Sequence, residues 1–517
     1  MRTKNSIKNI LLSFTNNIVI NLLRFVVRTF FIRYIGSLYL GVNGLLTNVL
    51  SVLSLADLGI SSAISFSLYK PLACNDKKII KSLMNFYKKA YFIIGTVILI
   101  LGLLLLPFLD FFVNNVDNIP MLKFYYLLFL INMVISYYLG YKRTLITADQ
   151  KGYKIQIITM IGNLVITILQ IICMYVFRNV EPKYIFSIYL GIQIFVTILE
   201  NIISNIYITN YYSYLREKNV EKLPQKEIQT IKKNVVALLF HKIGSYFVDC
   251  TDNLIISKYL GLVCVGLYSN YYLIINIFNK VIQTVLNNIV SSLGNLNASE
   301  SVEKKREVYN VTNFIGSFVF GLCSICFINL LQLFVGDIWL DETYILSFGV
   351  VIIISINFYV NGMMHINDAV KSSTGLYKED KYVPIIQSIV NIVVSILLVK
   401  RYGLIGVFIG TLISSILPTI IKPIIIYKKI FNSNSREYFV KYIINFILLV
   451  VSYFISSFII SLVPSSLNPY LLFLIYGIIS VIIPSTIFFI IYFRSSVFKN
   501  LLDRIRVILN SRRIKNG

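Results

Sequence analysis

The sequence predicts an all-α membrane protein of about 14 transmembrane helices. Of its 517 residues, 57% are hydrophobic and only 14% are charged, and the mean hydropathy is +0.76. A soluble chain of this size could not keep so much apolar surface out of water. The apolar residues also gather in long runs, and the basic residues between these runs alternate from one side to the other.

Fourteen apolar runs approach or exceed the roughly 20 residues that a helix needs to cross a bilayer. A β-barrel is excluded because its strands are segments of about ten residues with alternating polarity. The expected spans are 10–32, 41–66, 86–109, 122–141, 155–177, 184–208, 234–257, 262–292, 311–335, 344–366, 382–399, 404–427, 442–462 and 470–493.

The distribution of positive charge predicts the orientation of these spans. If the N-terminus is cytoplasmic, 36 of the 48 Lys and Arg residues fall on inside segments, 7 on outside segments and 5 within spans. This bias satisfies the positive-inside rule, so we expect both termini in the cytoplasm. The net charge of +25 is spread over every inside segment. No single domain therefore has the clustered basic residues of a nucleic-acid-binding protein.

Several function classes are disfavoured by what the sequence lacks. The expected outside loops are about a dozen residues or shorter, too short for an enzymatic domain on the outer surface. The G-x-x-x-x-G-K-[ST] pattern of ATP-binding loops does not occur. The two histidines, His241 and His365, show no metal-ligand spacing. We therefore expect a protein that is not an enzyme and needs neither a metal nor a cofactor.

An internal repeat indicates two related halves. The Tyr-Ile-Gly sequence at 34–36, followed by Gly41, recurs 225 residues later as Tyr-Leu-Gly at 259–261, followed by Gly266. Repeats with six spans each enter from the same side and hold substrate between them. The expected organisation is a six-helix lobe (1–210), a basic cytoplasmic linker (211–233), a second six-helix lobe (234–430), two additional helices (431–493) and a basic cytoplasmic tail (494–517).

A polar stripe runs along the first span. Its members are spaced 4, 3 and 4 residues apart, so they share one helix face: Asn17, Asn21, Arg24 and Arg28. The 225-residue offset predicts a matching stripe on the seventh span, with Asp252 beside it: Lys242, Tyr246, Asp249 and Asn253.

These stripes cannot face lipid, because a central Arg or Asp costs roughly 2.5–3.5 kcal/mol there. Two interpretations stay open. Arg24 and Arg28 form a buried, structural set of ion pairs with Asp249 and Asp252, or the stripes line a hydrophilic cavity that binds substrate. We favour the cavity, because intramembrane polar groups usually mark a transport path.

Asp57 is a separate candidate. It lies near the cytoplasmic end of the second span, in the sequence Leu-Ala-Asp-Leu-Gly. It either binds a coupling ion or caps a break in the helix, and the sequence does not favour one alternative over the other.

Short motifs resemble the bacterial polysaccharide flippases of O-antigen and capsule synthesis. They are SLADLGI at 54–60 leading to LYKPLA at 68–73, and TDNLIIS at 251–257 followed by GLYSNY at 266–271. The resemblance extends to about residue 430. These flippases belong to the superfamily of multidrug, oligosaccharidyl-lipid and polysaccharide exporters.

The resemblance implies a flippase of the bacterial cytoplasmic membrane. It would move an undecaprenyl-pyrophosphate-linked oligosaccharide between leaflets by alternating access of the two lobes, for capsule, O-antigen or other surface polysaccharide. Arg24 and Arg28 would hold the pyrophosphate, and Tyr246 and the asparagines the sugars. Na⁺ or H⁺ would drive transport, with Asp57, Asp249 and Asp252 as candidate ion-coupling residues. Membrane lipids, a glycan polymerase and glycosyltransferases are the expected partners.

Two relatives of this function stay open. One is a cation-coupled exporter of the multidrug type, in which Asp57, Asp249 and Asp252 could line an acidic pocket. The other is a flippase for the peptidoglycan lipid precursor. A polymerase or ligase is disfavoured, because such enzymes carry a large outer loop with clustered Arg and His.

Overall fold

The computed structural model describes most of the chain. The described residues are 19–57, 60–113, 119–149, 151–217, 251–296, 302–374 and 382–500, with short stretches at 220–221, 223–225, 227–229, 231, 376 and 379–380. Within them the regular structure is helical and no strand occurs. Ten of the described helices are long and apolar enough to cross a membrane, which identifies a multi-pass membrane protein. The expected count of 14 is not reached within the described residues.

The described chain divides into two compact units, Met1–Ser269 and Asn270–Gly517. The first unit begins with a helical segment at 19–34 and contains a second unlabelled helical segment at 251–260. Between them lie α2 (Ser37–Leu53), η1 (Ser54–Asp57), α3 (Ile60–Ala73), α4 (Lys77–Leu105), η2 (Leu106–Phe112), α5 (Leu122–Gly140), α6 (Arg143–Ala148), α7 (Tyr153–Val176), α8 (Pro182–Tyr211) and η4 (Ser213–Arg216).

One long helix, α10 (Leu262–Leu296), starts in the first unit and continues in the second. The rest of the second unit comprises α11 (Val302–Leu333), the π-helical turn η5 (Phe334–Trp339), η6 (Glu342–Tyr344), α12 (Phe348–Thr374), α13 (Val383–Lys429), α14 (Arg436–Ser461) and α15 (Pro469–Tyr492).

Local sequence explains where several helices begin. The carboxylate of Asp76 accepts the backbone N–H of Ile79 at 3.1 Å and caps α4. The side chain of Asn468 likewise accepts the N–H of Tyr470 at 2.9 Å at the start of α15. Pro469 and Pro182 occupy first helical positions, where a missing N–H costs nothing.

The expected span 41–66 is not one continuous helix, and this expectation is corrected. α2 ends at Leu53, a short 3₁₀ turn covers Ser54–Asp57, and α3 begins at Ile60. Ser54 turns its hydroxyl back to the carbonyl of Ser51 at 2.5 Å, which is how serine competes with regular helix geometry. The Leu-Ala-Asp-Leu-Gly sequence therefore coincides with a break in the second span.

The expected spans 382–399 and 404–427 form the two arms of α13, which folds back on itself. Gly403 has φ +58° and ψ −136°, outside helical geometry. Ser395 donates to the carbonyl of Val407 at 3.0 Å, and Asn391 donates to Thr411 at 3.1 Å. These contacts between the arms require an antiparallel pair of helices joined at 400–403.

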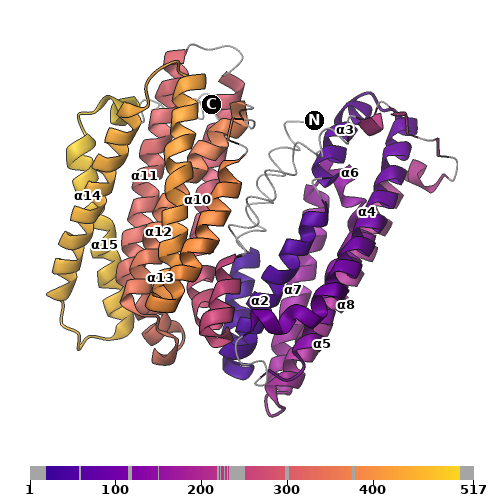
Figure 1. The fold of residues 1–517 in the computed structure, drawn as a ribbon, viewed down its shortest axis with the longest axis horizontal. Helices are drawn as coiled ribbons and strands as arrows, with labels where there is room; N and C mark the ends of the chain where they lie inside the picture. The colour runs from indigo at the N-terminus through magenta and orange to yellow at the C-terminus, as the bar shows by residue number, and fades with distance from the viewer. Residues whose placement is uncertain are drawn as a thin grey trace, which may run out of the picture. The chain divides into compact units, whose positions relative to one another are not determined.

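The two additional helices pack within the second unit. α14 and α15 lie against each other and against α11 (Figure 1). Asn329 of α11 donates to Ser480 of α15 at 2.9 Å, and Arg306 of α11 forms a salt bridge with Glu437 of α14. Tyr438 of α14 accepts a hydrogen bond from Asn367 of α12 at 3.1 Å. Interhelical polar contacts of this kind stabilise helix association in membranes, where the hydrophobic effect does not drive helices together.

The described residues of the expected linker 211–233 contact α4. Lys81 of α4 forms a 2.5 Å salt bridge with Glu217. The hydroxyl of Ser82 donates to the carbonyl of Glu221 at 2.8 Å. The lobe boundaries expected from the sequence stay predictions.

The repeat in the sequence is also a repeat of contacts, at the crossing of α2 and α10. Gly36 and Gly261, 225 residues apart, precede the two helices and have φ of +95° and +89°, values that glycine adopts without strain. A Cβ on Gly41 would lie 1.9 Å from the carbonyl oxygen of Leu262. A Cβ on Gly266 would lie 2.2 Å from that of Ser37, so the same contact occurs twice with its partners exchanged.

We predict that Gly41→Ala destabilises the protein. The added methyl group would meet the backbone of α10, and forcing helices apart in this way costs about 1–3 kcal/mol. The apparent Tm of the detergent-purified protein is the measurement. Gly191→Ala is the control, because a Cβ there meets nothing within 4 Å. Equal Tm values for the two variants would contradict a tight crossing.

Candidate functional site

The polar stripe of the first span is partly within the described residues. Asn17 lies outside them, whereas Asn21, Arg24 and Arg28 lie on the helical segment 19–34. Asn21 is 7% exposed, Arg24 is exposed and Arg28 is partly buried. The described part of the stripe thus contains a buried amide, an exposed guanidinium and a partly buried one.

Arg28 fastens the first helix to α10. Its Nη1 donates to the hydroxyl oxygen of Ser269 at 2.8 Å. That hydroxyl donates its own proton to the carbonyl of Gly266 at 2.8 Å. Because the proton of Ser269 is used there, its lone pairs are free to accept from the guanidinium. This contact lies one helical turn from the α2–α10 crossing and was not predicted from the sequence.

Tyr189 of α8 is the second neighbour of the stripe. It interacts electrostatically with both Arg24 and Arg28, and its ring meets that of Phe31 edge-on at 5.1 Å. Gln170 of α7, 3% exposed, donates to the Tyr189 carbonyl at 3.4 Å. Helices α7 and α8 therefore contribute polar groups beside the arginines.

No salt bridge to Arg24 occurs within the described residues. A guanidinium presents donors in a planar fork that matches phosphate and carboxylate oxygens.

The matching stripe on the seventh span is only partly described. Lys242, Tyr246 and Asp249 lie outside the described residues. Asp252 and Asn253 are partly buried in the helical segment 251–260, and the side-chain oxygen of Asn253 is buried without a hydrogen-bond partner there. The ion-pair and cavity interpretations both stay predictions.

Asp57 is 7% exposed and lies at the end of the 3₁₀ turn that interrupts the second span. The helix break that one alternative required is therefore present. Ion binding by Asp57 stays a prediction.

Glu200 of α8 is paired within the first unit. Arg143 donates to Glu200 of α8 at 2.9 Å, and Thr159 donates to the same carboxylate oxygen at 2.8 Å. Glu200 is thereby held between α6, α7 and α8, the structural role that burial among donors predicts.

A second charged cluster in the second unit was missed in the sequence. Lys371 of α12 forms a salt bridge with Asp380, and both side chains are almost completely buried. Lys422 of α13 pairs with Asp368 at 2.7 Å, and Asp368 also lies 3.8 Å from Lys371. The i,i+3 spacing of Asp368 and Lys371 could have predicted their proximity. The 54-residue separation of Asp368 and Lys422 gave no sequence signal for their pairing.

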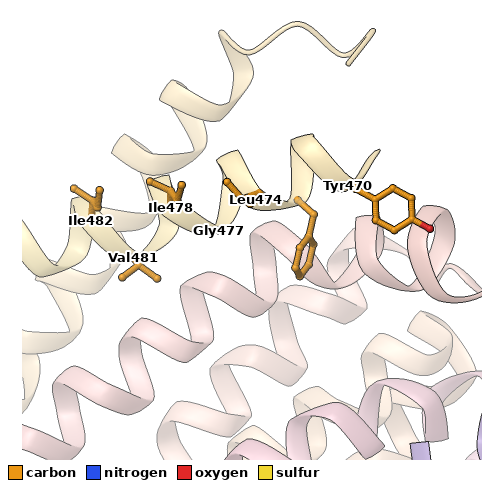
Figure 2. A pocket seen from close by; sticks show the side chains of 7 residues that line it. Tyr470, Leu474, Gly477, Ile478, Val481 and Ile482 are labelled. Atoms are coloured by element: carbon orange, nitrogen blue, oxygen red, sulfur yellow. The ribbon is translucent and has the colours of Figure 1, made fainter. Parts of the chain in front are cut away.

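A shallow groove on α15 is apolar and is no part of this site. One helix face lines it, as Figure 2 shows. The lining residues are Tyr470, Phe473, Leu474, Gly477, Ile478, Val481 and Ile482. Without charged groups this groove fits hydrocarbon and not sugars or phosphate.

Comparison with known proteins gives a family match. The family model described as "Polysaccharide biosynthesis protein" matches residues 6–293, which include the arginine stripe and the α2–α10 crossing. No curated protein sequence matches the chain.

Solved structures of transporters share the fold. The lipid II flippase MurJ in an inward closed conformation is 16% identical, with 93% of this chain and 98% of that chain covered and a TM-score of 0.66. An inward-facing multidrug resistance MATE family transporter of the MOP superfamily is 14% identical, with 80% and 96% covered and a TM-score of 0.55. A variant of the Vibrio cholerae MATE transporter VcmN is 13% identical, with 84% and 99% covered and a TM-score of 0.56.

We predict that the buried Lys371–Asp380 pair behaves differently when one partner or both are replaced. Lys371→Met leaves a buried carboxylate uncompensated, which costs about 3–5 kcal/mol, so the apparent Tm should fall. Adding Asp380→Leu removes that charge and should restore most of the loss.

The control is Lys123→Met, whose partner Asp110 is exposed like Lys123 itself. Removing an exposed pair costs about 0–1 kcal/mol, so its Tm should be close to that of the wild type. A double variant no more stable than Lys371→Met would contradict the predicted coupling.

Proposed function

The chain belongs to the family of polysaccharide biosynthesis proteins, and from that premise we propose that it is a flippase for a lipid-linked oligosaccharide. The cargo would be an oligosaccharide repeat unit on undecaprenyl pyrophosphate, moved across the bacterial cytoplasmic membrane for capsule, O-antigen or another surface polysaccharide. The family match and the transporter fold support a flippase of the MOP superfamily.

The arrangement of Arg24 and Arg28 is the observation that carries the proposal. Arg24 is an exposed residue and has no salt bridge to a carboxylate of the described residues. Arg28 is oriented by Ser269 at 2.8 Å. Two guanidinium groups one helical turn apart suit a pyrophosphate, whose oxygens accept bidentate, charge-assisted hydrogen bonds.

The sugars need polar partners on the way across. Burying a hydroxyl without a hydrogen bond costs about 1–3 kcal/mol on protein-derived estimates, so an unassisted oligosaccharide crosses extremely slowly. Asn21 and the unpartnered oxygen of Asn253 would replace water at some of these hydroxyls. We assign the remaining predicted members to the same site: Asn17, Lys242, Tyr246, Asp249 and Asp252.

In the proposed mechanism two six-helix lobes, 1–210 and 234–430, alternate in access while the lipid tail stays in the bilayer. The N- and C-termini lie in the cytoplasm, as the charge distribution predicts. Na⁺ or H⁺ coupling would use Asp57, Asp249 or Asp252. Glycosyltransferases would act before this translocation step, and a glycan polymerase would act after it.

We predict that Arg24→Ala and Arg28→Ala each strongly reduce surface glycan export while the protein level stays normal. Each removes a phosphate ligand worth about 1.5–3 kcal/mol as a charged hydrogen bond, so export should fall about tenfold or more. Immunoblotting of the surface glycan, in a deletion strain of the native host carrying each variant, measures this.

Arg33→Ala is the matched control. Arg33 lies on the same helical segment but outside the 3- and 4-residue spacing of the stripe, and its guanidinium lies 5.8 Å from the Tyr34 ring centroid, so export should be retained. Normal export by both Arg24→Ala and Arg28→Ala would refute the proposed role. Loss of viability on deletion under all conditions would instead indicate a peptidoglycan-precursor flippase, and drug hypersensitivity with a normal glycan would indicate a drug exporter.

A further inference from the structure

A cluster of lysines and tyrosines, which we call the Lys–Tyr cluster, lies where α7 begins and α8 ends. It comprises Lys151, Lys154, Tyr207 and Tyr211. The Lys154 ammonium lies 4.0 Å from the ring centroid of Tyr211 and 5.8 Å from that of Tyr207. The Lys151 ammonium lies 5.0 Å from the same Tyr211 ring. Tyr211 is 41% exposed, so the cluster is open.

The cluster carries more positive than negative charge. Lys151 is paired with Asp149 at 2.6 Å, and Asp149 also accepts the hydroxyl of Tyr212 at 2.7 Å. Lys154 has tyrosine neighbours but no salt bridge within the part of the chain that is described. Cation–π contacts hold its ammonium in place without neutralising it.

Two apolar stripes run from this cluster along the helices. On α7, Ile157, Ile161 and Ile168 follow Lys154 at helical spacing and are 40%, 53% and 55% exposed. On α8, Tyr211 and Tyr207 continue into Ile203 and Leu199 at intervals of four residues. Because α7 packs along α8 (Figure 1), both stripes begin at the Lys–Tyr cluster and run along neighbouring helices.

The positively charged cluster at one end of two apolar stripes matches a molecule with an anionic head group and hydrocarbon chains. Tyrosine and lysine at a membrane interface anchor a helix generally, but that role does not explain an ammonium that lies near two rings and has no carboxylate partner in the described part of the chain. A phosphate group near Lys154 and Lys151 would supply the counter-ion. Hydrocarbon chains would cover the isoleucines below it.

We infer that the Lys–Tyr cluster binds an anionic phospholipid. Its phosphate contacts the Lys154 and Lys151 ammonium groups and the Tyr207 and Tyr211 hydroxyls, and its acyl chains lie along Ile157, Ile161 and Ile203. The occupant is bulk membrane lipid and not the transported cargo, because the side chains below the cluster are exposed isoleucines that suit acyl chains and not sugars. The inference does not depend on the proposed function.

The test uses the full-length protein in mixed micelles and native mass spectrometry. Retained phosphatidylglycerol is compared with phosphatidylcholine of the same acyl chains. The wild type should retain phosphatidylglycerol preferentially, and Lys151→Gln with Lys154→Gln should lower its retention at least about fivefold, because each surface lysine strengthens attraction to anionic lipid. Lys154→Gln alone is the second variant, since it breaks no salt bridge and should lower retention in the same direction.

The matched control is Lys428→Gln with Lys429→Gln. It removes the same charge from two exposed lysines at the end of α13 and should leave retention unchanged. Equal retention of the two lipids, or an equal loss in the control pair, would overturn the inference by showing unspecific attraction. Preferential displacement of phosphatidylglycerol by undecaprenyl phosphate would overturn it by identifying the cargo lipid as the occupant.

Discussion

The cost of placing charge in hydrocarbon is the constraint on which the arrangement of this chain depends. Some charges on the spans satisfy it by pairing. Glu200 receives hydrogen bonds from Arg143 and Thr159, and Lys422 pairs with Asp368. In the arginine stripe, Arg28 contacts a hydroxyl of α10. Its charge therefore also contributes to helix association.

The crossing of α2 and α10 gives the stripe its position. Two glycines allow the helices to approach until backbone meets backbone, and Ser269, which accepts from Arg28, follows Gly266 by three residues. Close approach at glycine is a general means of helix association in membranes. Here the crossing, the sequence repeat and a candidate ligand-binding arginine occur within one helical turn of each other.

The second unit shows how additional helices are joined to such a fold. α14 and α15 pack on α11 through amide, hydroxyl and ionic contacts, among them Asn329 with Ser480 and Arg306 with Glu437. Their outer faces stay apolar, and the groove on α15 is lined by hydrocarbon and ring carbons (Figure 2). The polar contacts on one face and the apolar groove on the other match a helix that lies between protein and lipid.

The sequence by itself determined the all-helical membrane class, most span positions, the repeat and the arginine stripe. These depend on hydrophobic run length and on helical periodicity, which are local properties. Only the tertiary structure decided the pairing of Lys422 with Asp368 and the contact of Arg28 with Ser269. These contacts join residues 54 and 241 positions apart. No local pattern encodes which distant side chain meets another, because that depends on how whole helices pack.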